Sequence, residues 1–310
     1  MAASADSSDP FRSRGMPYDA FDQLTATHVS IGATDLAIGF APGAIDLPPA
    51  TVVEWIAASA AIVAAYYGAF PVKHVRILIV ADEGNGVRSG MAFAQRGAAL
   101  RVVLGRATTP SALAGDWILI HELTHLAFPS VLRAHHWIEE GLASYVEPIA
   151  RAQAGKLSER DVWRQFVDGM PKGLPAAGDR GLDYTPTWGR TYWGGALFCL
   201  LADIDIRKRT SNRFGLQDAL RAIVAAGGNL EVDWPLERAL DTGDAAVGVS
   251  VLSDLYSRMK ATPIAIDLPQ LWRQLGIEPA GNSVGFDNTA PLAPIRRAIT
   301  KSAVAAGAKS

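Results

Sequence analysis

The chain has 310 residues, of which 49% are hydrophobic and 19% are charged, and these proportions argue against a disordered protein. The formal net charge of −2 gives no basic field for nucleic acid and no polybasic run for an acidic membrane, so neither partner is predicted. Cys199 is the only cysteine, which excludes an internal disulfide, and its apolar surroundings predict a buried thiol.

No membrane span is predicted from the hydropathy of the chain. The longest apolar stretch, Val52 to Phe70, is rich in alanine, contains Glu54 and is framed by prolines and Gly68. The charge and the helix breakers favour a helix of a soluble domain. The first sixteen residues are polar and lack an apolar core, so the chain as given is expected to carry no signal peptide.

The N-terminal third predicts a small α/β lobe over residues 20–111, after a loose tail over residues 1–19. A near-continuous apolar run, Val75 to Val80, has the length and composition of a central strand. The glycines between Asp82 and Gly90 predict a loop that leads into a pair of strands. The other expected elements are a hairpin at residues 27–31 and 36–40, a helix at residues 50–68 and, as one strand of that pair, residues 99–104.

From residue 112 onward the spacing of apolar residues becomes helical, which predicts a mostly helical lobe over residues 112–310. Seven helices are expected, at residues 112–128, 136–147, 158–168, 191–209, 216–226, 249–260 and 268–275. A short strand at residues 283–286 and a closing helix at residues 291–300 should follow them. The predicted fold class is therefore α+β, with a small mixed-sheet lobe followed by a helical lobe. A cleft is expected where the lobes meet, at the helix of residues 112–128.

That helix contains His121-Glu122-Leu123-Thr124-His125, an HExxH motif. Residues i and i+4 share one face of a helix, so His121 and His125 can bind one metal ion, with Glu122 beside it to orient a water. The flanking residues are apolar, and two imidazoles and a carboxylate are costly to place on so apolar a helix unless an ion compensates them. We therefore predict a Zn²⁺ site at His121 and His125.

Two histidines need a third protein ligand and an open position for water. The metzincin pattern would place glycine and histidine where this chain has Phe128 and Val131, so that class is excluded. The candidates that follow the motif are two carboxylates and two imidazoles: Glu139, Glu140, His135 and His136.

A second motif lies among these candidates. The segment Trp137 to Glu147 (WIEEGLASYVE) resembles the W-x-x-E-G-x-A-x-Y-x-E signature of gluzincin peptidases of the aminopeptidase N and glycyl aminopeptidase families. The resemblance implies that Glu140 is the third zinc ligand and that Glu147 lies just outside the ligands and supports them. Glu140 and Glu147 are two helical turns apart on one face, which agrees with these roles, whereas Glu139 is expected to point elsewhere.

A third similarity involves Thr191 to Leu197 (TYWGGAL), which is similar to the Y-x-K-G-a segment of the same families, except that Gly194 replaces the usual lysine. The resemblance implies that Tyr192 donates a hydrogen bond to the oxyanion of the reaction. Packing at a helix start is the alternative role for this tyrosine. The resemblance covers about residues 112 to 226 and implies a gluzincin (thermolysin-like) catalytic fold.

Together the motifs predict a zinc-dependent peptidase that acts on peptide or protein substrates. In the expected chemistry, Glu122 takes the proton of a zinc-activated water and Tyr192 stabilises the oxyanion. An edge strand between Gly90 and Leu104 is expected to bind an extended peptide by strand addition. Two alternatives are a zinc-binding pseudo-peptidase or interaction module without turnover, and an enzyme that hydrolyses a non-peptide amide.

The predicted strands also bear on where a peptide would be cut. Large aminopeptidases bind the free ammonium group of the substrate with a glutamate in a strand motif upstream of HExxH, but the comparable segment here, Ser89 to Ala94, has no acidic residue. The lost charge-assisted hydrogen bond predicts that the chain is not a strict aminopeptidase and cuts internally. Glu139 could supply the missing carboxylate if its side chain turned towards the cleft.

Overall fold

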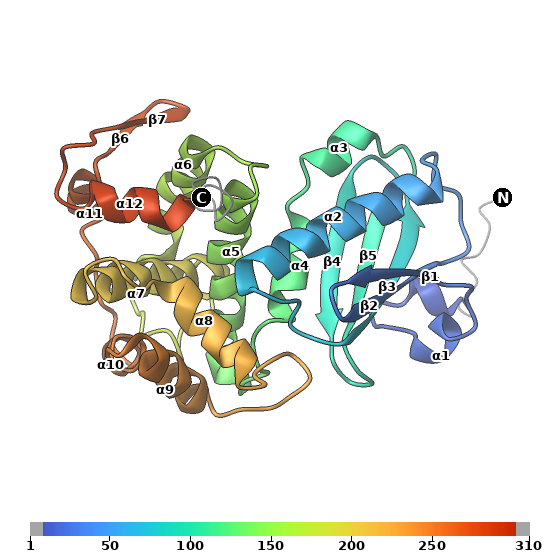
Figure 1. Cartoon of the computed structure of the whole chain (residues 1–310), viewed down its shortest axis with the longest axis horizontal. Helices are drawn as coiled ribbons and strands as arrows, with labels where there is room; N and C mark the ends of the chain where they lie inside the picture. Colours follow the sequence, from blue (N-terminus) through green and yellow to red (C-terminus); the bar gives the residue numbers. More distant parts are fainter. Residues whose placement is uncertain (1–8, 302–310) are drawn as a thin grey trace, which may run out of the picture.

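The structure is a computed structural model and describes residues 9–301. Figure 1 shows two halves side by side, a sheet with its covering helices and an array of helices, with α4 (Ile118–His125) between them. One core of buried apolar side chains runs through both halves. The boundary predicted at residue 111 stays an interpretation, because α4 packs against both the sheet and the helical array.

The sheet has five strands, in the order β1-β2-β3-β5-β4. They are β1 (Thr27–Ile31), β2 (Thr34–Phe40), β3 (His74–Asp82), β4 (Val87–Phe93) and β5 (Ala99–Gly105). The outer pairs, β1 with β2 and β4 with β5, are antiparallel, and the inner pairs are parallel. The mixed sheet, the hairpin and the central strand β3 are thus confirmed, and β4 is an edge strand.

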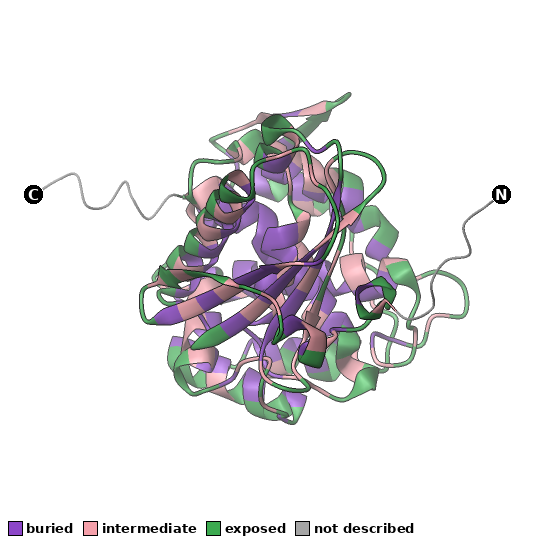
Figure 2. Ribbon diagram, turned by 90° about the vertical axis from the view of Figure 1, so that its right-hand side faces the viewer, coloured by how far each residue is buried: buried purple, intermediate pink, exposed green. Residues whose placement is uncertain are grey.

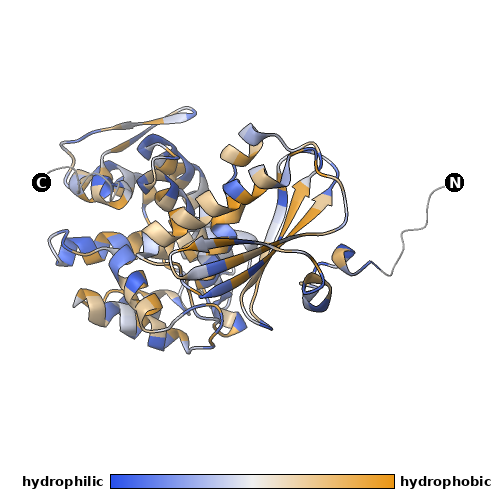
Figure 3. Ribbon diagram, turned by 45° about the vertical axis from the view of Figure 1, so that its right-hand side comes forward, coloured by the Kyte–Doolittle hydropathy of each residue, from blue (hydrophilic) through white to orange (hydrophobic). Residues whose placement is uncertain are grey.

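Both faces of the sheet are covered, because alternate side chains of each strand point to opposite sides. One face carries Ile77 and Leu100 into the main core, beneath the long helix α2 (Pro49–Tyr67). On the opposite face, Leu78 packs in a smaller cluster with residues of the N-terminal segment. Figure 2 shows buried residues along the strands, and Figure 3 shows the same strands as the most apolar part of this half.

α2 is the one helix within residues 9–301 that is long and apolar enough to cross a membrane by length and composition. In this fold it instead lies against α4, α5 and β1, and 44% of its most apolar window is buried. Its packing accounts for its hydrophobicity as a core helix.

The helical half follows α4, beginning with α5 (His136–Gln153). The remaining helices and one hairpin are α6 (Glu159–Gly169), α7 (Gly195–Arg209), α8 (Leu216–Ala225), α9 (Leu236–Val247), α10 (Leu252–Met259), α11 (Leu268–Leu275), β6 (Ile277–Ala280) with β7 (Ser283–Phe286), and α12 (Ala293–Thr300). Short 3₁₀ turns and one π-helical turn complete it: η2 (Arg133–His135), η3 (Met170–Gly173) and η4 (Arg190–Gly194). The mostly helical lobe is thus confirmed, although α9 and β6 were not predicted.

The helix predicted at residues 112–128 is in fact two helices, α3 (Pro110–Ala114) and α4. They are separated at Gly115, and the Asp116 carboxylate accepts hydrogen bonds from the backbone N–H groups of Ile118 and Leu119 at 3.1 and 2.9 Å. This side chain therefore caps the first turn of a new helix, because it pairs donors that the helix itself leaves unpaired.

The loose tail predicted for residues 1–19 is wrong for the part that the structure describes. Residues 1–8 lie outside the described residues, but η1 (Pro10–Arg12) and α1 (Tyr18–Phe21) pack on the sheet through Phe11, Tyr18 and Phe21. The strand β4 also begins inside the loop predicted at residues 82–90. The prediction missed this start because the segment contains glycines and charged residues, which are common at an exposed edge strand.

Candidate metal centre and active site

α4 presents its two histidines from an otherwise buried helix. Leu119 and Leu123 are fully buried and fix the opposite face of α4 in the core. His121 and His125 therefore point the same way, with ring centroids 4.9 Å apart.

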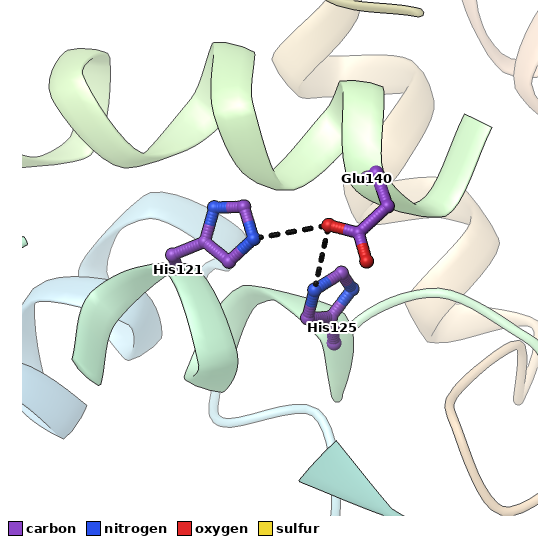
Figure 4. A group of neighbouring side chains, drawn as sticks. All are labelled: His121, His125 and Glu140. Carbon is purple, nitrogen blue, oxygen red and sulfur yellow. Dashed lines mark hydrogen bonds and ion pairs between the residues drawn. The ribbon is translucent and has the colours of Figure 1, made fainter. Parts of the chain in front are cut away.

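α5 places Glu140 against these two rings. The Glu140 Oε2 atom lies 3.2 Å from Nε2 of His121 and 3.5 Å from Nε2 of His125, as Figure 4 shows. Within residues 9–301 these three residues form the one group of histidine, cysteine or acidic side chains with ligand atoms all within 4.8 Å of one another. The structure thus brings together the three residues predicted to bind the metal.

The spacing of these atoms fits a zinc ion. Zinc bonds to nitrogen and oxygen of about 2.1 Å in a tetrahedral site place neighbouring ligand atoms about 3.4 Å apart. The two distances to Glu140 Oε2 bracket that value. Two imidazole nitrogens and one carboxylate oxygen are also the donor set of catalytic zinc sites, which leave the fourth position open.

The charges of the three side chains are coupled through Glu140. Burial tends to raise the pKa of Glu140, but hydrogen bonds from His121, His125 and His136 outweigh it, and the pKa lies well below the ordinary value. Burial lowers the pKa of His121 despite Glu140. At His125 burial acts in the same direction, but the neighbouring carboxylates outweigh it and the pKa is raised. Glu140 is therefore an anion, and a cation is the partner that this site favours.

Glu122 lies beside these three side chains, between α4 and the edge strand β4. A Cβ atom on Gly90 would lie 2.4 Å from Cγ of Glu122, so only glycine lets the strand approach this side chain. Burial raises the pKa of Glu122 to about 7, opposed by His125 and the Ala92 amide and reinforced by Glu140. A carboxylate with a pKa near neutrality suits proton transfer.

Tyr192 lies in the π-helical turn η4, which packs closely on α5. Gly141 of α5 and Gly195 face each other so tightly that a Cβ atom on Gly141 would lie 2.3 Å from the carbonyl carbon of Gly195. This approach brings the Tyr192 ring over His121, with centroids 6.3 Å apart. Burial and the carboxylates of Glu140 and Glu122 raise the pKa of Tyr192 to about 12, so its hydroxyl keeps a proton to donate.

The residues next to Glu140 take different positions. Glu139 contacts Nδ1 of His136 at 2.8 Å and accepts a hydrogen bond from the Val131 backbone at 3.4 Å, so it does not join the two histidine ligands. His136 contacts Oε1 of Glu140 at 3.3 Å, and these two carboxylates raise its pKa to about 10. His135 faces away from the centre and contacts Asp183 at 3.1 Å.

A cavity of about 500 Å³ opens over the centre. It is lined by residues of β4, α4 and α5 together with Tyr192 and Leu230: Gly90, Met91, Ala92, His121, Glu122, His125, His136, Glu139, Glu140, Tyr192 and Leu230. As expected, Glu139 is not part of the group formed by His121, His125 and Glu140, although its side chain lines the cavity beside His136.

Glu147 lies two turns beyond Glu140 and is buried. It accepts a hydrogen bond from Arg151 at 2.8 Å, and burial raises its pKa to about 7 although Arg151 acts against the shift. Nδ1 of His121 has no hydrogen-bond partner among residues 9–301. The supporting role expected of Glu147 therefore stays a prediction.

The fold is similar to that of known zinc peptidases. An aminopeptidase N family protein from Idiomarina loihiensis has a TM-score of 0.59 and 14% identity over 87% of this chain and 53% of that chain. An M1 zinc metallopeptidase from Deinococcus radiodurans has a TM-score of 0.51 and 16% identity over 79% of this chain and 52% of that chain. No family model matches the sequence, and no curated protein matches it either.

At these identities the similarity shows the fold alone, and the chain spans about half the length of both neighbours. The expectation of an α+β fold like that of the aminopeptidase N family is confirmed at this level. The closer likeness to glycyl aminopeptidases and the thermolysin-like arrangement stay predictions.

Some contacts that shape the site were not predicted from the sequence. Asp116 starts α4, Gly90 admits Glu122 against β4, and His136 contacts the far oxygen of Glu140. The pair His135-His136, just before the signature that begins at Trp137, was a sequence signal for the contact of His136 with Glu140. The contacts of His136 nevertheless depend on how α5 begins.

Proposed function

We propose that the protein is a zinc-dependent peptidase that hydrolyses peptide bonds with an activated water. The observation that carries the proposal is the convergence of His121, His125 and Glu140 on one point, with Glu122 beside it in an open cavity. This is the donor set, the open position and the neighbouring base that hydrolytic zinc sites use. The two structural neighbours, an aminopeptidase N family protein and an M1 zinc metallopeptidase, support the same substrate class.

In this proposal each residue has a separate task. A zinc ion held by His121, His125 and Glu140 would polarise the scissile carbonyl and lower the pKa of a bound water. Glu122 takes a proton from the attacking water and passes it to the leaving amine. Tyr192 donates its hydroxyl proton in a hydrogen bond to the oxyanion that develops on the substrate.

The edge strand β4 supplies a way to hold the substrate. Its antiparallel partner β5 pairs with one side of β4, which leaves the other side without a strand neighbour in the described sheet. An extended peptide could add to this side by backbone hydrogen bonds. Gly90 and Met91 of β4 line the cavity over the centre, so the added chain would pass Glu122.

The alternative is a zinc-binding pseudo-peptidase or interaction module that does not turn over a substrate. The placement of Glu122 and Tyr192 around the cavity favours the enzyme, because a module that only binds zinc has no need of either side chain.

Metal analysis combined with peptide turnover tests the proposal. The purified protein is expected to hold about one zinc per chain, and a chelator is expected to remove both zinc and activity. The variants His121→Ala and His125→Ala should lose the metal, whereas His74→Ala, at an exposed position on β3, should keep it. Full zinc occupancy in the first two variants would show that the site is elsewhere.

A further inference from the structure

A second cavity, of about 580 Å³, adjoins the first and shares His121 and Tyr192 with it. It extends away from β4, between α5, α6 and η4, and receives no role in the chemistry described above. Its lining combines aromatic and charged side chains. Two of the aromatic side chains contact the shared residues: Trp117 contacts His121, and Trp188 contacts Tyr192.

These two tryptophans stand at the shared end of the second cavity. Trp117 meets the His121 ring edge-on with centroids 5.7 Å apart, and Trp188 stacks on Tyr192 with centroids 5.8 Å apart. They are 51% and 61% exposed, although indole rings are usually buried. Large apolar side chains left exposed beside a cavity mark a binding surface.

A third tryptophan forms a fixed wall of the second cavity. The ring of Trp193 lies so close to the α6 backbone that a Cβ atom on Gly169 would be 2.1 Å from it. Because the backbone holds this ring in place, the wall is formed before any ligand arrives, and a ligand loses less freedom by binding to it.

The charged residues of the second cavity largely neutralise one another. Glu147 pairs with Arg151 at 2.8 Å, and Arg164 pairs with Asp168 at 3.2 Å. The ammonium group of Lys172 lies 5.8 Å from the centre of the Trp193 ring. Asp161 contacts Ser158 at 2.6 Å. The cavity therefore offers a charged ligand little net attraction and offers an uncharged ring three indole surfaces.

We propose that the second cavity is a subsite that binds an aromatic side chain of a peptide substrate, at a residue next to the bond that is cut. The proposal rests on the peptidase function proposed above. Trp117 and Trp188 are its specificity-determining residues, since each lines the second cavity and contacts a residue that the two cavities share.

Selectivity between matched peptides tests the subsite. Peptides that carry phenylalanine or alanine at each position flanking the cut bond are compared by kcat/KM with zinc-loaded protein. Phenylalanine is expected to be favoured by about 10- to 100-fold at one of these positions, the effect of burying its ring. Trp188→Ala and Trp117→Ala should each reduce this ratio several-fold. The ratio is the readout because any loss of turnover common to both peptides cancels.

Tyr184→Ala is the matched control, since Tyr184, a short distance before Trp188 in the sequence, is a similarly exposed aromatic residue that does not line the second cavity. It should leave the selectivity ratio unchanged. A ratio near one at both flanking positions, or an equal effect of Tyr184→Ala and Trp188→Ala, would overturn the subsite while leaving the peptidase proposal intact.

A binding measurement separates this inference from the peptidase proposal. Saturation-transfer NMR with N-acetyl-L-phenylalaninamide should detect binding that N-acetyl-L-alaninamide does not match and that Trp188→Ala weakens. If the protein cleaves no peptide but binds this amide through Trp188, the subsite stands and the peptidase function fails. Equal signals from the two amides would count against the subsite, whatever the turnover.

Discussion

At the residue scale, the Glu140 carboxylate sets the charge of the side chains around it. Three imidazoles approach its two oxygens, His121 and His125 at one and His136 at the other. Their hydrogen bonds keep Glu140 ionised although it is buried, and in return it raises the pKa of His125 and His136. A metal ion entering this site must therefore displace protons.

Zinc affinity is accordingly expected to rise with pH. His125 must be neutral to bind the metal, and its pKa is raised, so protons compete with zinc on the acid side. His136, with a pKa of about 10, adds a positive charge that opposes the ion until it loses its proton. The dissociation constant should fall by roughly tenfold per pH unit for each proton displaced.

Competition with a chelator at pH 6, 7 and 8 measures this slope. Because His136 stays protonated over this range, His136→Gln should bind zinc more tightly at each pH, whereas His135→Gln, at the neighbouring residue that contacts Asp183, should bind like the wild type. An affinity independent of pH would contradict the charge coupling through Glu140.

Tyr192 is the second residue whose role follows from its position. Tyr192→Phe removes one hydroxyl from a half-buried ring, so it is expected to lower kcat by about 10²-fold and to leave zinc content and thermal stability nearly unchanged. Steady-state kinetics with metal analysis provides the check. An unchanged kcat would reassign Tyr192 to packing against His121 and Trp188.

At the element scale, the site depends on the contact between α4 and β4. Gly90 is the point of closest approach, where an added Cβ would lie 2.4 Å from Cγ of Glu122 and 3.0 Å from a methyl group of Ile118. Glu122, the proposed base, is therefore held against the strand proposed to bind the peptide.

Gly90→Ala is expected to displace Glu122 and to lower kcat/KM by about 10²-fold, because misplacement of a catalytic group by about 1 Å costs that much. Zinc content should remain near one per chain. Gly15→Ala, where an added Cβ meets nothing within 4 Å, is the matched control. Equal activity of the two variants would show that β4 does not position Glu122.

The edge strand also bears on where a substrate is cut. β4 carries no acidic residue, and the Glu139 carboxylate, although it lines the cavity, is paired with the protonated His136 at 2.8 Å, so its charge is already balanced. Neither β4 nor Glu139 therefore offers an unpaired carboxylate to bind the free ammonium group of a peptide. N-acetylation of a peptide should then leave its cleavage largely intact, and internal bonds should be cut. Release of single N-terminal residues only, abolished by acetylation, would instead establish an aminopeptidase.

The parts predicted from sequence were those with local signals. The spacing of HExxH fixes His121 and His125 on one face of a helix, and the apolar run at Val75 to Val80 has the composition of a central strand. By contrast, Glu139 lines the cavity because of a contact with His136, and Phe11 is ordered because it packs on a sheet far along the chain. Such tertiary contacts leave no periodic pattern in the sequence.

At the scale of the whole molecule, α4 joins the two halves and carries the centre of the site. One continuous core reaches from the sheet through α4 and α5 into the helical array. Glu122 of α4 faces the edge of the sheet, Glu140 comes from the first helix of the array, and Tyr192 comes from the turn before α7. The proposed chemistry therefore depends on how α4 packs against both halves.

The most direct test is to digest an unbiased peptide library with zinc-loaded wild-type protein and with zinc-loaded Glu122→Gln. The products are identified by mass spectrometry. The wild type should cut peptide bonds, and the variant should hold the same zinc but lose activity by roughly 10²- to 10⁴-fold, because it lacks the base that takes the proton from water. A wild-type protein that holds one zinc per chain and cuts nothing, or a variant that cuts as well as the wild type, would contradict the account.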